Sequence, residues 1–124
     1  MRTFKKYYSI PAPPEDLYLA LTNPLTIHLW SGEEAIMSDK VDSEFSLWEG
    51  SIVGRNLEFE ENKKIVQEWY FGQKEASIVT MKLHSDHKGT SLELAHTNIP
   101  DEAYDEIVEG WNPTYIGGLI EFYN

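Results

Sequence analysis

Four histidines are the most obvious candidates for chemistry in this chain, and their positions separate them into classes. His84 and His87 flank Asp86, and two imidazoles with a carboxylate could form an open zinc site if the backbone turned them together. The surrounding letters, SDHKGT, are typical of an exposed hairpin turn, so we expect no metal site there. His96 lies in an alternating segment, where it could be a general base, bind a polar ligand group, or be a hydrogen-bonded core imidazole. His28 is expected at a cavity rim or in solvent.

The carboxylates favour a solvated surface over catalysis. Glu58 and Glu60 alternate with the apolar Leu57 and Phe59, so they should face water, whereas paired catalytic carboxylates need burial to separate their pKa values. The chain has no cysteine, which excludes disulfides, thiolate metal ligands and a cysteine nucleophile. We therefore predict no catalytic residue, no metal and no cofactor.

Large apolar side chains remain as candidates, either as packed core or as the lining of a pocket for a flat apolar ligand. They fall on the expected inner faces of the sheet and of the C-terminal helix. The candidate cavity residues are Trp30, Phe45, Leu47, Trp69, Val79, Met81, Leu92, Leu94, His96, Trp111, Tyr115 and Leu119. Arg55, a basic residue of an inner strand, could anchor a carboxylate if it faced the same way.

The elements that must position these residues follow from periodicity. Alternation predicts a strand at about residues 3–10. The letters PAPPED then predict a helix start, because proline suits a first turn and acids favour the positive end of the helix dipole. Asn23-Pro24 ends this helix, and a second short helix, LTIHLW, stops at Ser31-Gly32.

From about residue 35 to 97 the apolar residues alternate, with turn-like letters between segments, which predicts an antiparallel meander with one wet and one dry face. Helical spacing returns at Asp101. Its apolar stripe comprises Tyr104, Val108, Trp111, Tyr115, Leu119 and Phe122. Pro113 and three glycines interrupt this helix, so we expect it to be kinked. The fold class is α+β: a curved antiparallel sheet of about six or seven strands around one long C-terminal helix.

Composition restricts the partners. The 124 residues predict a single domain, residues 1–124, and the charge of −11 is concentrated toward the C-terminus, with no Lys or Arg after Lys88. We expect no binding to nucleic acid or to an anionic membrane, because both would repel this surface. The acidic surface either solubilises the chain or meets a basic protein. No stretch resembles a membrane span or signal peptide, so we expect a cytoplasmic protein.

Four stretches, taken in order, carry a family resemblance: IPAPPEDLYLALTNPLTIHLW, GSIVGRNLEFEENKKIVQEW, GTSLELAHTNIPDE and GWNPTYIGGLIEFY. This series resembles the START-like, or polyketide cyclase/birch-pollen-allergen-like (SRPBCC), superfamily, in its branch similar to the 90-kDa heat-shock protein ATPase activator. The resemblance implies a helix-grip fold with a cavity between the sheet and the terminal helix. It also implies a range of functions, from lipid and hormone carriers to cyclases and co-chaperones.

Three functions follow as hypotheses. The first is a non-enzymatic domain that binds a small hydrophobic or amphipathic ligand in an open cavity, lined among others by Trp69, Met81, Leu94 and Trp111. The second is a co-chaperone-like module of the stress response, whose acidic surface meets a chaperone or another basic protein. The third is a cyclase- or dehydratase-like enzyme that uses His96 and Tyr115. Exposed aromatic residues could also support a homodimer.

Overall fold

The computed structural model describes residues 1–72 and 74–124 and shows one sheet, two short helices and one long C-terminal helix. The elements in chain order are β1 (Arg2–Ile10), α1 (Pro14–Thr22), α2 (Pro24–Ser31), β2 (Glu44–Leu47), β3 (Ile52–Glu60), β4 (Lys64–Trp69), β5 (Ser77–Asp86), β6 (Gly89–Ile99), the 3₁₀ turn η1 (Asp101–Ala103), α3 (Tyr104–Glu109), the π-helical η2 (Gly110–Ile116) and α4 (Gly117–Tyr123). The predicted order of elements is confirmed, with six strands in the described sheet.

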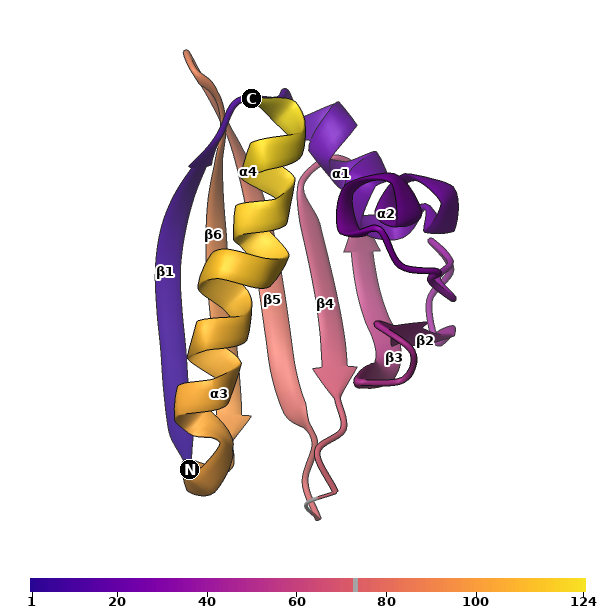
Figure 1. Ribbon diagram of the computed structural model, residues 1–124, viewed down its shortest axis with the longest axis vertical. Helices are drawn as coiled ribbons and strands as arrows, with labels where there is room; N and C mark the ends of the chain where they lie inside the picture. Colours follow the sequence, from indigo (N-terminus) through magenta and orange to yellow (C-terminus); the bar gives the residue numbers. More distant parts are fainter. Residues whose placement is uncertain (73) are drawn as a thin grey trace.

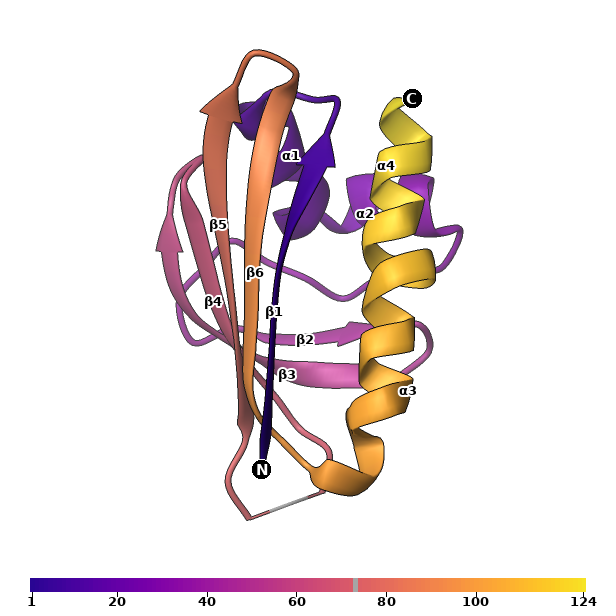
Figure 2. The same cartoon turned by 90° about the vertical axis from the view of Figure 1, so that its left-hand side faces the viewer.

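The sheet is antiparallel throughout, with the strand order β1-β6-β5-β4-β3-β2. The C-terminal helix lies across one face of it, and α1 and α2 stand beside α4 at one end (Figure 1). The sheet is strongly curved, since β2 and β3 run almost crosswise to β1 and β6 (Figure 2). At Gly54 of β3 a Cβ would collide with the carbonyl oxygen of Glu68 and lie 2.8 Å from Cζ of Phe45, so this tight stretch requires glycine.

The two short helices begin and end where the sequence predicts. Pro14 opens α1, and Glu15 and Asp16 occupy its first turn. The side chain of Asn23 caps α2, with Oδ1 accepting hydrogen bonds from the N–H groups of Leu25 at 2.9 Å and Thr26 at 3.1 Å. Gly32 closes α2 with φ at 79°, a left-handed conformation that glycine adopts easily.

The C-terminal helix accommodates its helix breakers differently from the prediction. We expected a kink, yet α3, η2 and α4 follow one another without a sharp bend (Figure 2). Pro113 lies inside the π-helical stretch, where the N–H of Gly117 donates to the carbonyl of Asn112, five residues back. A Cβ on Gly117 would lie 2.8 Å from that oxygen. Glycine is therefore required for the wide turn, which replaces the expected kink.

The core lies between the inner face of the sheet and the helices. Ile65, Val79, Met81, Leu92 and Leu94 are fully buried on the strands. From the helix side Trp111, Tyr115 and Leu119 cover them, as the stripe predicts. Phe122, the last residue of that stripe, is instead 43% exposed, and the hydroxyl of its neighbour Tyr123 donates to the carbonyl of Asp16 at 3.2 Å.

The outer face of the sheet carries the charges. Nζ of Lys64 lies 3.0 Å from carboxylate oxygens of both Glu58 and Glu60, in agreement with their predicted exposure. Arg55 also lies on this face, with Nε 3.0 Å from Oε1 of Glu68, so it does not line the inner face. No helix within the described residues is long and apolar enough to cross a membrane.

Candidate functional site

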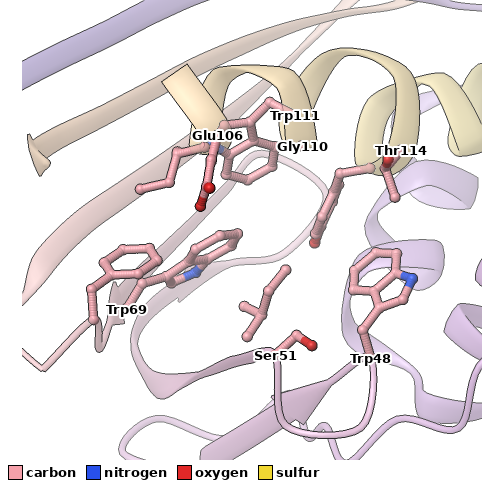
Figure 3. Close-up of a pocket in the computed structure, with 11 residues that line it drawn as sticks. Trp48, Ser51, Trp69, Glu106, Gly110, Trp111 and Thr114 are labelled. Atoms are coloured by element: carbon pink, nitrogen blue, oxygen red, sulfur yellow. The ribbon is translucent and has the colours of Figure 1, made fainter. Parts of the chain in front are cut away.

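A groove of about 430 Å³ opens between the C-terminal helix and the β2–β4 side of the sheet (Figure 3). Five of its eleven lining residues are aromatic, and the others are aliphatic, glycine, hydroxyl-bearing or acidic. The lining residues are Trp48, Ser51, Ile52, Trp69, Phe71, Glu106, Ile107, Gly110, Trp111, Thr114 and Tyr115. Ser51, Glu106, Gly110 and Thr114 are exposed, so the groove communicates with solvent along the helix.

A chain of ring contacts forms the wall. The indoles of Trp69 on β4 and Trp111 on the helix stack with centroids 4.9 Å apart and planes 23° from parallel. The ring of Tyr115 lies 4.6 Å from that of Trp111, and the ring of Trp48 lies 5.5 Å from that of Tyr115. Sheet, helix and the β2–β3 turn therefore each contribute aromatic surface to one groove.

The β2–β3 turn holds Trp48 in an unusual backbone conformation. Trp48, Glu49 and Gly50 have φ values of 49°, 55° and 88°. The left-handed region costs a bulky residue roughly 1–2 kcal/mol. Contacts of the Trp48 ring with Trp30, at 5.8 Å, and with Tyr115 offset that cost. The turn thus places a large ring over the groove rather than in solvent (Figure 3).

Buried hydrogen bonds fix the indoles from behind. Nε1 of Trp69 donates to Oε1 of Gln67 at 2.9 Å, and Nε2 of Gln67 donates to Oδ1 of Asn56 at 2.9 Å. Nδ2 of Asn56 donates in turn to Oγ of Ser43 at 3.0 Å. The polar edge of Trp69 is therefore satisfied inside the protein, and the small part of the residue that stays exposed, 4%, borders the groove.

His96 serves as an anchor for the helix. Its Nδ1 accepts a hydrogen bond from Nε1 of Trp111 at 3.0 Å, so the neutral ring carries its proton on Nε2. That Nε2 is buried and has no hydrogen-bond partner in the described part of the chain. Burial lowers the pKa of His96 to about 4, and the ring is neutral at pH 7. It lies against Trp69, Phe71 and Trp111, behind the groove wall.

The predicted cavity residues divide into two groups. Trp69, Trp111 and Tyr115 belong to the core cluster and are only 4%, 2% and 3% exposed, but their edges also line the groove. The other candidates lie in the packed core and do not belong to the lining: Trp30, Phe45, Leu47, Val79, Met81, Leu92, Leu94, His96 and Leu119. Tyr115 lines the groove, but His96 does not. The Nδ1 atom of His96 instead accepts a hydrogen bond from Trp111, so the two side chains that an enzyme would use do not meet in the groove.

Several lining residues were missed by sequence reasoning. Trp48 and Phe71 lie between the alternating segments, in stretches that we interpreted only as turns, and Glu106 belongs to the acidic C-terminal surface. An unusual aromatic residue within each polar turn was the available signal for the first two. Nothing in the pattern distinguished Glu106 from its acidic neighbours.

His84 and His87 are both exposed at the turn between β5 and β6. Nε2 of His84 lies 3.0 Å from Oε1 of Glu93, and Oδ1 of Asp86 accepts the N–H of Lys88 at 2.8 Å, which closes the turn. His28 is exposed on α2. Among the described residues no group of three or more His, Asp or Glu side chains could hold a metal ion.

Known proteins resemble this chain over nearly its whole length. An HSP90 activator from Plasmodium falciparum is 30% identical, with a TM-score of 0.85, over 94% of this chain and 92% of that one. The Activator of 90 kDa heat shock protein ATPase homolog of Dictyostelium discoideum is 27% identical over 89% of this chain. This chain spans about a third of the length of the curated relatives it matches, 31% and 30%.

The Aha1 dimer from Colwellia psychrerythraea shares the fold, with a TM-score of 0.84 at 16% identity, over 100% of this chain and 99% of that one. The sequence model of the family described as "Activator of Hsp90 ATPase homolog 1-like protein" matches residues 11–121. The helix-grip architecture and this match agree with the resemblance found in the sequence. The chain therefore belongs to the family of activator of Hsp90 ATPase homolog 1-like proteins.

Proposed function

We propose that the chain is a binding domain that holds a small hydrophobic or amphipathic molecule in the aromatic groove. The observation that carries this proposal is an open groove of about 430 Å³ lined by five aromatic side chains, Trp48, Trp69, Phe71, Trp111 and Tyr115. Such volume suits a small ligand. Burying roughly 150 Å² of apolar ligand surface would contribute about 4 kcal/mol, from which the cost of immobilising the ligand is subtracted.

Native mass spectrometry of the protein purified from its own host tests this function. A stoichiometric small molecule, identified after solvent extraction, is the expected result, and the same spectrum reports whether the chain forms the predicted homodimer. Trp48→Ala should release that molecule, because it removes one wall of the groove. Tyr7→Ala, an exposed aromatic residue of β1, is the matched control and should retain it. If Trp48→Ala and Tyr7→Ala lost the molecule equally, the groove would not be its binding site.

A second function is contact with a 90 kDa heat shock protein. Its support is the similarity to the HSP90 activator of Plasmodium falciparum and to the activator homolog of Dictyostelium discoideum, together with the acidic terminal helix. Asp101, Glu102, Asp105 and Glu109 are exposed on η1 and α3. An acidic surface of this kind would meet a basic patch on the chaperone, and the association should weaken as salt screens it. The cytoplasmic location expected from the sequence belongs to this proposal.

Binding of the purified chaperone at low and at high salt tests this contact. The double variant Glu102→Gln with Asp105→Asn should weaken binding about tenfold at low salt. Glu33→Gln with Glu34→Gln removes equal charge next to α2 and should change binding little. Absence of binding at low salt would eliminate this function, whereas an equal loss in both double variants would remove the acidic terminal helix as the site of contact.

A further inference from the structure

The aromatic groove has one charged group at its mouth. Among the described residues that line it, Glu106 is the one that carries a formal charge, and the others are apolar, glycine or hydroxyl-bearing. Glu106 belongs to α3, and its carboxylate points from the helix toward Trp69 (Figure 3). A ligand that fills the groove would therefore meet a negative charge beside the stacked indoles.

Within the described part of the chain, no ion pair involves the carboxylate of Glu106. The ion pairs of the described residues involve other acids, namely Glu58, Glu60, Glu68, Glu93 and Asp101. Its neighbours on α3, Asp105 and Glu109, are acidic as well, and no Lys or Arg follows Lys88. Arg2 of β1 lies 3.9 Å from the centroid of the Tyr104 ring on the same helix, but Glu106 is the charged residue among those that line the groove, so an anionic ligand group placed beside it would be repelled.

The aromatic walls of the groove also favour a positively charged ligand group. Aromatic rings present negative faces, so a cation within about 6 Å of a ring centroid is attracted by the ring quadrupole. The half-buried Trp48 and Phe71 still expose part of their surface beside the groove. Rings on several sides and a carboxylate at the mouth are the surroundings in which proteins hold ammonium groups.

We infer that the ligand of this groove is an organic cation, with an apolar or aromatic body against Trp69 and Trp111 and an amine or quaternary ammonium beside Glu106. This inference rests on the proposed binding function and specifies the chemical class of its ligand. The body is held by desolvation, and the charge selects among bodies of similar shape.

A matched series of probes tests the inference: para-tert-butylbenzylamine, its neutral analogue para-tert-butylbenzyl alcohol, and the anion para-tert-butylbenzoate. Titration followed by tryptophan fluorescence at an ionic strength of about 0.15 M gives the three affinities. We expect the amine to bind about tenfold more tightly than the alcohol, and the benzoate more weakly than both.

Two variants assign the effect to Glu106. Glu106→Gln should weaken binding of the amine by about tenfold and leave the alcohol unchanged, because only the charge is removed. Glu109→Gln removes the same charge from the same helix outside the lining, and it should change the amine affinity less than about twofold, as screened remote charges do.

The outcomes separate this inference from the function on which it rests. If the alcohol binds as tightly as the amine, the cation inference is overturned while the groove remains a binding site. If none of the three probes binds, the inference fails too, and native mass spectrometry of the host protein decides the proposed function independently. Equal losses in Glu106→Gln and Glu109→Gln would attribute the preference to overall charge and overturn the role of Glu106.

Discussion

The two ends of the C-terminal helix pack differently on the same sheet. At the α4 end, Ile116 and Leu119 are fully buried, and a Cβ on Gly118 would lie 3.4 Å from Cε3 of Trp30, so helix and helix meet closely. At the α3 end, Ile107 is only half-buried and the helix stands over the groove. The difference arises because α1 and α2 fill the first end (Figure 1), whereas a turn carrying Trp48 borders the second. Neighbouring elements therefore decide whether apolar residues of this helix are enclosed in the core or border an open groove.

The largest expected effect belongs to the closed end. Leu119→Ala should lower the free energy of unfolding by about 3 kcal/mol, because a fully buried side chain leaves a cavity. Urea denaturation measures the loss, and the folded variant should keep its ligand affinity. A loss below about 1 kcal/mol would show that this end can collapse and is not rigidly packed.

The second effect concerns the histidine behind the open end. The pKa of His96 is about 4 in the folded chain, below the ordinary value of 6.5. Between these two pH values the unfolded chain therefore binds a proton at this residue and the folded chain does not. Stability is therefore lost as the pH falls from about 6.5 to about 4. Relative to His96→Gln, the parent chain should lose about 2–3 kcal/mol between pH 7 and pH 4.5, the range in which the folded imidazole stays neutral. Parallel pH dependences in urea denaturation would contradict the buried, neutral imidazole.

The π-helical stretch between the two ends gives the third effect. Gly117→Ala should destabilise by roughly 1–3 kcal/mol, because its Cβ would meet the carbonyl oxygen of Asn112 at 2.8 Å. Gly110→Ala is the control: a Cβ there meets nothing within 4 Å, and alanine favours helix by up to about 1 kcal/mol. Thermal unfolding of both variants should shift in opposite directions. If both substitutions raised the unfolding temperature, the π-helical turn would tolerate a side chain at Gly117.

The smallest stability effect belongs to the open end. Trp48→Ala should change the free energy of unfolding by less than about 1 kcal/mol, since the half-buried ring is lost together with part of the strain of a bulky left-handed residue. The same urea denaturation measures it. If Trp48→Ala were as destabilising as Leu119→Ala, the turn would be part of the core and the contrast between the two ends would disappear.

Much of the fold could be predicted from periodicity. Alternation identified the strands and their wet faces, and the Asn23 and Gly32 signals fixed the ends of the short helices. The groove could not be predicted in the same way. Periodicity states which face is apolar, but coverage of that face depends on sheet curvature and on turns such as the one at Trp48. Met81 and Leu94, for example, share the inner face with Trp69 but lie fully buried in the core.

The π-helical stretch also sets a rotational phase. Each residue of an α-helix turns the chain by about 100°, and the wide turn at Asn112–Gly117 departs from that step within an otherwise regular helix. If the same residues formed regular α-helix instead, α3 would be rotated by roughly 100° relative to α4, because an i→i+5 turn holds about one residue more than an α-helical turn. Glu106 and Ile107 would then leave the groove while Leu119 stayed in place. The π-helical stretch thus lets Glu106 and Ile107 face the groove while Leu119, on the same helix, faces the core.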